Sequence, residues 1–159
     1  MSETANLLMV ERYKYILDQK KSLNERTFKI AAFYQAVTLA VATAQFKVVS
    51  EAANKSLRTT LAVDASWGLF IIFCFVSMVT VLLLVGGITA WADYKIEEEA
   101  LEAGLLSDTR IEGRFFDFLK WYETYLIAAA ILGVVLYLLM LKFRVLGILE
   151  TLGSQLSST

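Results

Sequence analysis

Three long stretches without a charged side chain constrain this 159-residue chain more than any other feature. They are Ile30–Phe46, Ala65–Ala92 and Thr124–Leu141, and a helix needs about 17–25 apolar residues to cross the hydrocarbon of a bilayer. Hydrophobic residues make up 57% of the chain and charged residues 19%, against about 45–50% and about 25% in an average soluble domain. The sequence therefore predicts an all-α integral membrane protein with three transmembrane helices.

The three apolar stretches divide the chain into seven predicted segments. Residues 1–29 carry ten charged side chains, six of them Lys or Arg, and neither proline nor glycine separates this segment from the first span. We therefore expect a cytoplasmic amphipathic helix that continues directly into the membrane, with one less polar face made by Met9, Tyr13, Ile16, Leu23 and Thr27. The other segments are expected as a first span at 30–49, an outer loop at 50–64, a second span at 65–92, a helical acidic cytoplasmic loop at 93–120, a third span at 121–142 and an interfacial tail at 143–159.

Aromatic residues stand near the ends of the spans, where indole and phenol rings favour the membrane interface. Trp67 and Trp91 bracket the second span, and the helix between them is about 36 Å long at 1.5 Å per residue. The third span is entered through Trp121, Tyr122 and Tyr125. These five side chains are predicted to anchor the helices at the two membrane surfaces.

The distribution of Lys and Arg predicts the orientation, because short cytoplasmic segments carry the excess of basic residues. Residues 1–29 and 93–120 together hold ten, against five in residues 47–64 and the tail. The N-terminus is therefore expected in the cytoplasm and the C-terminus outside. Residues 93–120 have eight acidic and four basic side chains, so we expect this loop to dock on the basic helix through Lys20 and Lys21.

One face of the first span is polar or small. Gln and Thr side chains in hydrocarbon need hydrogen-bonding partners, which neighbouring helices usually supply. The face either holds the three helices of one subunit together, or it forms a helix interface between subunits or the wall of a water-filled path when several copies assemble. Its members recur at three- and four-residue spacing: Ala31, Gln35, Thr38, Ala42 and Gln45.

A second ridge on the same span consists of alanines at four-residue steps. Small residues at this spacing allow two helix backbones to approach closely. Two spaced pairs in the other spans have the same character. The predicted close-packing residues are Ala32, Ala36, Ala40, Ala44, Gly86, Ala90, Ala129 and Gly133.

The composition removes most enzyme chemistry. The chain has no His and one Cys, Cys74, so an imidazole base, an imidazole metal ligand and a cysteine pair are all excluded. The acidic cluster at Glu97–Glu102 is interpreted as a solvated helix face, since no calcium-loop pattern surrounds it. We expect no catalytic residue, metal site or cofactor. The net charge of −1 gives little support to a nucleic-acid partner.

The spans contain no Asp, Glu, Lys or Arg, which argues against a coupled transporter because transporters usually keep such residues at depth. The arrangement of a charged helix, ERYKYILDQKKSLNERTFK, leading into a small bundle of spans is similar to that of several bacterial membrane effectors and accessory subunits, although no signature motif is shared. That similarity implies a bacterial inner membrane. The predicted function is a non-enzymatic protein that self-associates through its first span into a pore-like or membrane-perturbing assembly gated by its cytosolic helices. The alternative is an accessory or scaffold subunit that binds a different membrane protein.

Overall fold

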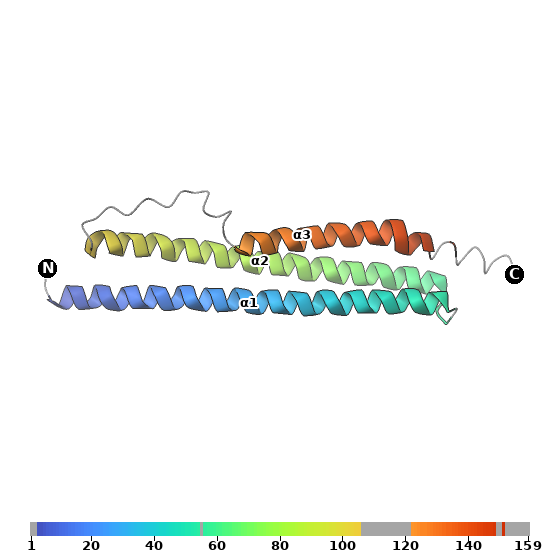
Figure 1. The fold of residues 1–159 in the computed structure, drawn as a ribbon, viewed down its shortest axis with the longest axis horizontal. Helices are drawn as coiled ribbons and strands as arrows, with labels where there is room; N and C mark the ends of the chain where they lie inside the picture. The colour runs from blue at the N-terminus through green and yellow to red at the C-terminus, as the bar shows by residue number, and fades with distance from the viewer. Residues whose placement is uncertain (1–2, 55, 106–121, 149–150, 152–159) are drawn as a thin grey trace. The chain divides into compact units, whose positions relative to one another are not determined.

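The computed structural model describes residues 3–54, 56–105, 122–148 and 151, and these residues form helices without any strand. Helix α1 is Glu3–Ala53, α2 is Thr59–Leu105 and α3 is Tyr122–Met140 (Figure 1). A five-residue π-helical segment, η2 at Leu141–Val145, continues α3. The prediction that the charged N-terminal segment and the first span form one unbroken helix is confirmed, since α1 has no break across residues 29 and 30.

All three helices have segments long and apolar enough to cross a membrane, within Leu7–Ala53, Thr59–Leu101 and Tyr122–Ile148. The all-helical class and the three candidate spans therefore agree with the sequence prediction. Helix α2 continues from the second apolar stretch to Leu105, so the first part of the expected acidic loop is an extension of that helix. The rest of that loop lies outside the described residues.

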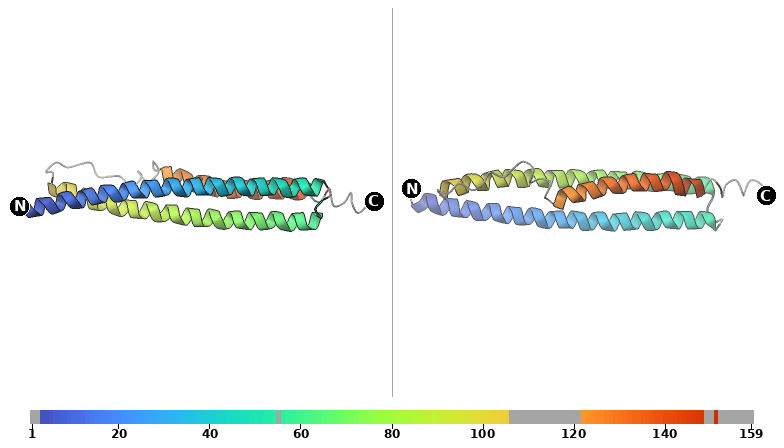
Figure 2. Two further views of the ribbon diagram at one scale, coloured as in Figure 1. Left: turned by 90° about the horizontal axis from the view of Figure 1, so that it is seen from below. Right: turned by 45° about the horizontal axis from the view of Figure 1, so that its top comes forward.

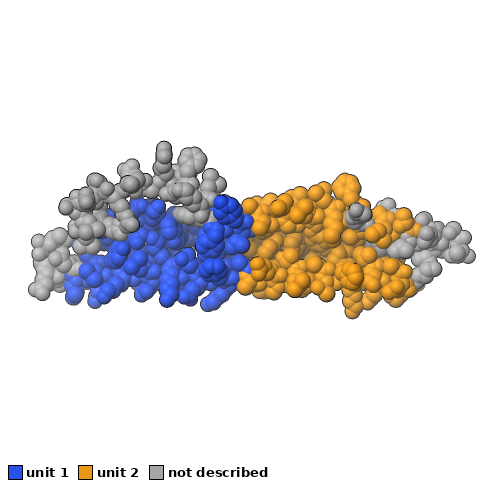
Figure 3. All heavy atoms as spheres, in the orientation of Figure 1, with its two compact units in different colours: residues 1–31, 82–126 blue, residues 32–81, 127–159 orange. Residues whose placement is uncertain are grey.

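The helices belong to two compact units (Figure 3). Unit 1 comprises residues 1–31 and 82–126, and unit 2 comprises residues 32–81 and 127–159. Within each unit α1 and α2 lie side by side (Figure 2). In unit 2 Tyr34 bonds to Ser77 and Gln45 to Ser66, so the two helices run in opposite directions there.

The amphipathic face predicted for the N-terminal segment packs inside unit 1. Ile16 is fully buried and Thr27 nearly so, whereas Met9, Tyr13 and Leu23 are half-buried. Leu84 and Ile88 of α2 are buried in the same unit. The spacing of apolar residues in the sequence therefore identified the side of α1 that packs on a neighbouring helix.

The connection between α1 and α2 is shorter than the outer loop expected at residues 50–64. Only residues 54–58 separate the two helices, and the Glu51 carbonyl accepts hydrogen bonds from the amides of Ser56 and Leu57 and from the Ser56 hydroxyl. Both helices extend into the polar segment 50–64 because apolar residues of this segment pack in a cluster. This cluster contains Ala52, Ala62, Leu141 and Val145.

Candidate functional site

A buried hydrogen-bonded junction in unit 2 joins all three helices through Gln45. The Gln45 side chain is 3% exposed, and its Nε2 donates to Ser66 Oγ of α2 at 2.9 Å. The Tyr137 hydroxyl of α3 donates to Gln45 Oε1 at 3.0 Å. Ser66 Oγ in turn donates to the Ala62 carbonyl at 2.8 Å. The Gln45 amide therefore finds its partners within the subunit. This agrees with the interpretation that the polar face holds the three helices of one subunit together.

A second junction in unit 2 surrounds Tyr34. Its hydroxyl lies 3.1 Å from Ser77 Oγ, and its ring centroid lies 6.0 Å from that of Phe73. Gly133 of α3 faces this pair, because a Cβ at Gly133 would lie 3.5 Å from Tyr34 Oη and 3.7 Å from Phe73 Cζ. A Cβ at Gly133 would thus make ordinary van der Waals contacts with this pair, and the role of Gly133 in close helix packing stays a prediction.

Sequence reasoning missed the partners in both junctions. Ser66 and Ser77 are buried, and they are polar residues within an otherwise apolar span. Their presence in the second span is a signal that could have placed them on its inner face. Tyr34 and Tyr137 carry no comparable signal, since aromatic residues are ordinary in membrane helices.

The polar face predicted on the first span does not act as one surface. Gln45 is buried, Ala31 and Thr38 are half-buried, and Gln35 and Ala42 are exposed. The Thr38 hydroxyl donates to the Tyr34 carbonyl at 2.8 Å, so it is satisfied within α1. Gln35 makes no hydrogen bond with any residue that the structure describes.

The alanine ridge lies on a different side of α1 from the buried residues. Ala32, Ala36 and Ala40 are exposed, and Ala44 is half-buried. Among the other predicted close-packing residues, Gly86 and Ala129 are exposed and Ala90 is half-buried. A Cβ at Gly86 would meet no described atom within 4 Å. Among the described residues, Ala32, Ala36, Ala40 and Gly86 are therefore left largely uncovered, while Ala44 is partly covered.

An ionic contact in unit 1 joins α1 to the acidic extension of α2. Lys20 Nζ pairs with the Glu98 carboxylate, and each of these side chains is only 16% exposed. Arg12 Nη2 lies 2.6 Å from Glu97 Oε1. The expected docking of the basic helix on the acidic segment is confirmed for Lys20, whereas Lys21 is exposed.

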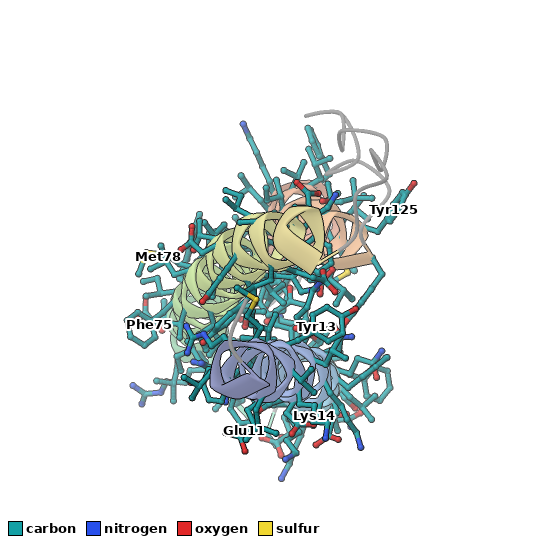
Figure 4. The ribbon with its side chains drawn as sticks, turned by 90° about the vertical axis from the view of Figure 1, so that its left-hand side faces the viewer. Glu11, Tyr13, Lys14, Phe75, Met78 and Tyr125 are labelled. Atoms are coloured by element: carbon teal, nitrogen blue, oxygen red, sulfur yellow. The ribbon has the colours of Figure 1, made fainter. Side chains whose placement is uncertain are left out.

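The predicted aromatic anchors take different environments. Trp67 is exposed and meets Phe70 edge to face, and Tyr125 is exposed and projects outward from α3 (Figure 4). Trp121 lies outside the described residues. In unit 1 Trp91 is level with Lys20, whereas Tyr122 stacks on Phe28 with centroids 5.5 Å apart. Lys20 and Phe28 are eight residues apart on α1, or about 12 Å of helix. The apolar part of α2, which ends near Trp91, therefore extends beyond the start of α3 at Tyr122.

Within the described residues, no three His, Cys, Asp or Glu side chains form a group that could hold a metal ion. Glu97 and Glu98 pair with cationic side chains, and Cys74 is half-buried on α2. No protein-family model, curated protein or solved structure matches the chain.

Proposed function

We propose that the protein is a non-enzymatic membrane protein that self-associates through α1 and forms a pore-like or membrane-perturbing assembly. Few residues of the apolar segments are buried within the chain, since the buried share of their most apolar windows is only 11%, 22% and 11%. Their exposed surface needs lipid or other copies of the chain around it. We place the protein in a bacterial inner membrane because of its similarity of layout to bacterial membrane effectors. The distribution of Lys and Arg favours a cytoplasmic N-terminus.

The exposed alanine ridge is the observation that carries the proposal. Buried Val41 and Gln45 mark the side of α1 that packs within the subunit, while Ala32, Ala36 and Ala40 lie on an exposed side. In hydrocarbon, helices associate by close van der Waals packing of small residues rather than by the hydrophobic effect. We infer that the ridge packs on a second copy.

Gln35, on a neighbouring side of α1, supports self-association through this helix for an independent reason. It is an exposed amide in the apolar part of α1, and an amide in hydrocarbon without a hydrogen bond is costly. A partner subunit or a water-filled path between subunits would satisfy it. Gln45 is already satisfied by Ser66 and Tyr137, so Gln35 is the side chain that we assign to the subunit interface or the path.

The ionic contact of unit 1 is the proposed gate. It holds the cytosolic extension of α2 against α1 through Lys20 and Glu98, and both helices continue from this contact into their apolar segments. Loosening the contact would let the two helices shift against each other. We therefore expect Lys20→Met to increase permeation through the assembly.

Leakage of a small fluorescent dye from vesicles that contain the purified protein tests this function. We expect leakage from vesicles with the Lys20→Met protein, loss of that leakage when Ala36→Leu and Ala40→Leu are added, and no loss when the matched control Ala128→Leu is added. Ala128 is an exposed alanine on α3. Equal leakage with and without the ridge substitutions would overturn the proposal that the subunits associate through α1. If vesicles with every variant retain the dye, the proposed pore is wrong. A subunit that is stable only together with a different membrane protein would favour an accessory role.

A further inference from the structure

Helix α1 carries two lines of residues with heptad spacing in unit 1, side by side. The first line packs within the unit through Met9, Tyr13, Ile16 and Lys20, which are all buried or half-buried. The second line is shifted by one residue along the chain and is exposed throughout. We call this second line the outer seam, and it consists of Leu7, Val10, Lys14, Leu17 and Lys21.

The apolar side chains of the outer seam are exposed. Leu7 is 63% exposed, Val10 45% and Leu17 43%. Figure 4 shows Tyr13 on the side of α1 that faces α2, while Lys14 and Glu11 point away from α2. Leucine and valine at seam positions are the residues that drive helix pairing in coiled coils, and a lysine at such a position restricts register and partner choice.

Acidic residues border the seam lysines at three- and four-residue steps. These are Glu11, Asp18 and Glu25, and all three are exposed. Neither they nor Lys14 and Lys21 form an ion pair with a residue that the structure describes. The surface therefore alternates in sign and is close to neutral, with two positive and three negative side chains.

We propose that the outer seam of one subunit packs on the outer seam of a second copy as a two-helix coiled coil. The inference rests on the proposed self-association, because copies inserted in the same orientation bring their α1 helices parallel. Apolar seam residues of both copies are then covered, and the lysines of one copy meet the carboxylates of the other. A nearly neutral surface of alternating sign matches a copy of itself, whereas an anionic lipid surface or a nucleic acid attracts clustered basic residues.

Cysteine cross-linking tests the proposal, since the chain has one native cysteine. In a Cys74→Ser background, Val10→Cys and Leu17→Cys place single thiols on the outer seam. Leu8→Cys is the matched control, because Leu8 is 61% exposed but lies off the seam. Under mild oxidation in membranes, we expect covalent dimers to form several-fold faster at positions 10 and 17 than at position 8.

A charge exchange tests the pairing itself in the Leu17→Cys protein. One variant carries Lys14→Glu and Lys21→Glu, and the other carries Glu11→Lys, Asp18→Lys and Glu25→Lys. We expect each variant alone to lose the covalent dimer and a mixture of the two to regain it as a mixed dimer. No regain in the mixture would overturn the proposed charge pairing, as would equal cross-linking at positions 8, 10 and 17.

The mass of the uncross-linked Cys74→Ser protein in nanodiscs separates this inference from the function on which it rests. A discrete oligomer that cross-links at neither position 10 nor position 17 would overturn the outer seam and leave self-association intact. A single subunit in each nanodisc would overturn both.

Discussion

The ammonium of Lys20 lies 4.6 Å from the ring centroid of Trp91 while it pairs with Glu98. One cation of α1 thus contacts both an aromatic ring and a carboxylate of α2. Lys95 approaches the same ring at 5.8 Å. A cation over an indole ring contributes about 0.5–2 kcal/mol, and removing one partner of a largely buried ion pair is costly because it leaves a buried charge uncompensated. Together with the Arg12–Glu97 pair, this contact links α1 to the acidic end of α2 within unit 1.

Replacing Lys20 with Met removes the ion pair and the cation–π contact, and it leaves Glu98 largely buried without its partner. We expect unit 1 to lose roughly 1–3 kcal/mol of stability, measured as faster amide hydrogen exchange in residues 8–28. Lys21→Met is the matched control, because Lys21 is exposed. Equal exchange in the two variants would show that the Lys20 contact does not stabilise the unit.

The two glutamines of the first span are predicted to behave differently. Gln45→Leu removes the partner of Ser66 and Tyr137, so the free energy of unfolding in detergent should fall by about 0.6–2 kcal/mol. Gln35→Leu should leave this free energy unchanged or raise it, because Gln35 is exposed. Thermal unfolding followed by tryptophan fluorescence measures both variants. A larger loss for Gln35→Leu would contradict the assignment of Gln45 to the interior of the subunit.

The loss of stability caused by replacing a glycine should also depend on its position. A leucine at Gly133 extends beyond a Cβ that would itself lie at van der Waals distance from Tyr34 and Phe73. The added atoms would displace the Tyr34 ring and break its bond to Ser77, and overpacking of this kind costs about 1–3 kcal/mol. Gly86→Leu is the control, since the space around Gly86 is open. The thermal midpoints of the two variants check this difference, and a lower midpoint for Gly86→Leu would be the opposite result.

The sequence predicts the helices of this protein better than their contacts. The unbroken α1 follows from the absence of Pro and Gly before residue 68, and the inner face around Ile16 follows from the spacing of apolar residues. The partners of Gln45 and Tyr34 depend on the register between helices, which periodicity within one helix does not contain. The short connection at residues 54–58 was missed for a related reason. Ala52 and Ala62 pack in the core beside it, and this packing outweighs the polar composition of the segment.

The mass of the wild-type protein, expressed alone and extracted directly into lipid nanodiscs, tests self-association through α1 most directly. We predict one discrete oligomer that converts to single subunits when Ala36→Leu and Ala40→Leu are introduced, and that persists with Ala128→Leu. Wild-type protein that contains one subunit per nanodisc at every protein-to-lipid ratio would contradict the account.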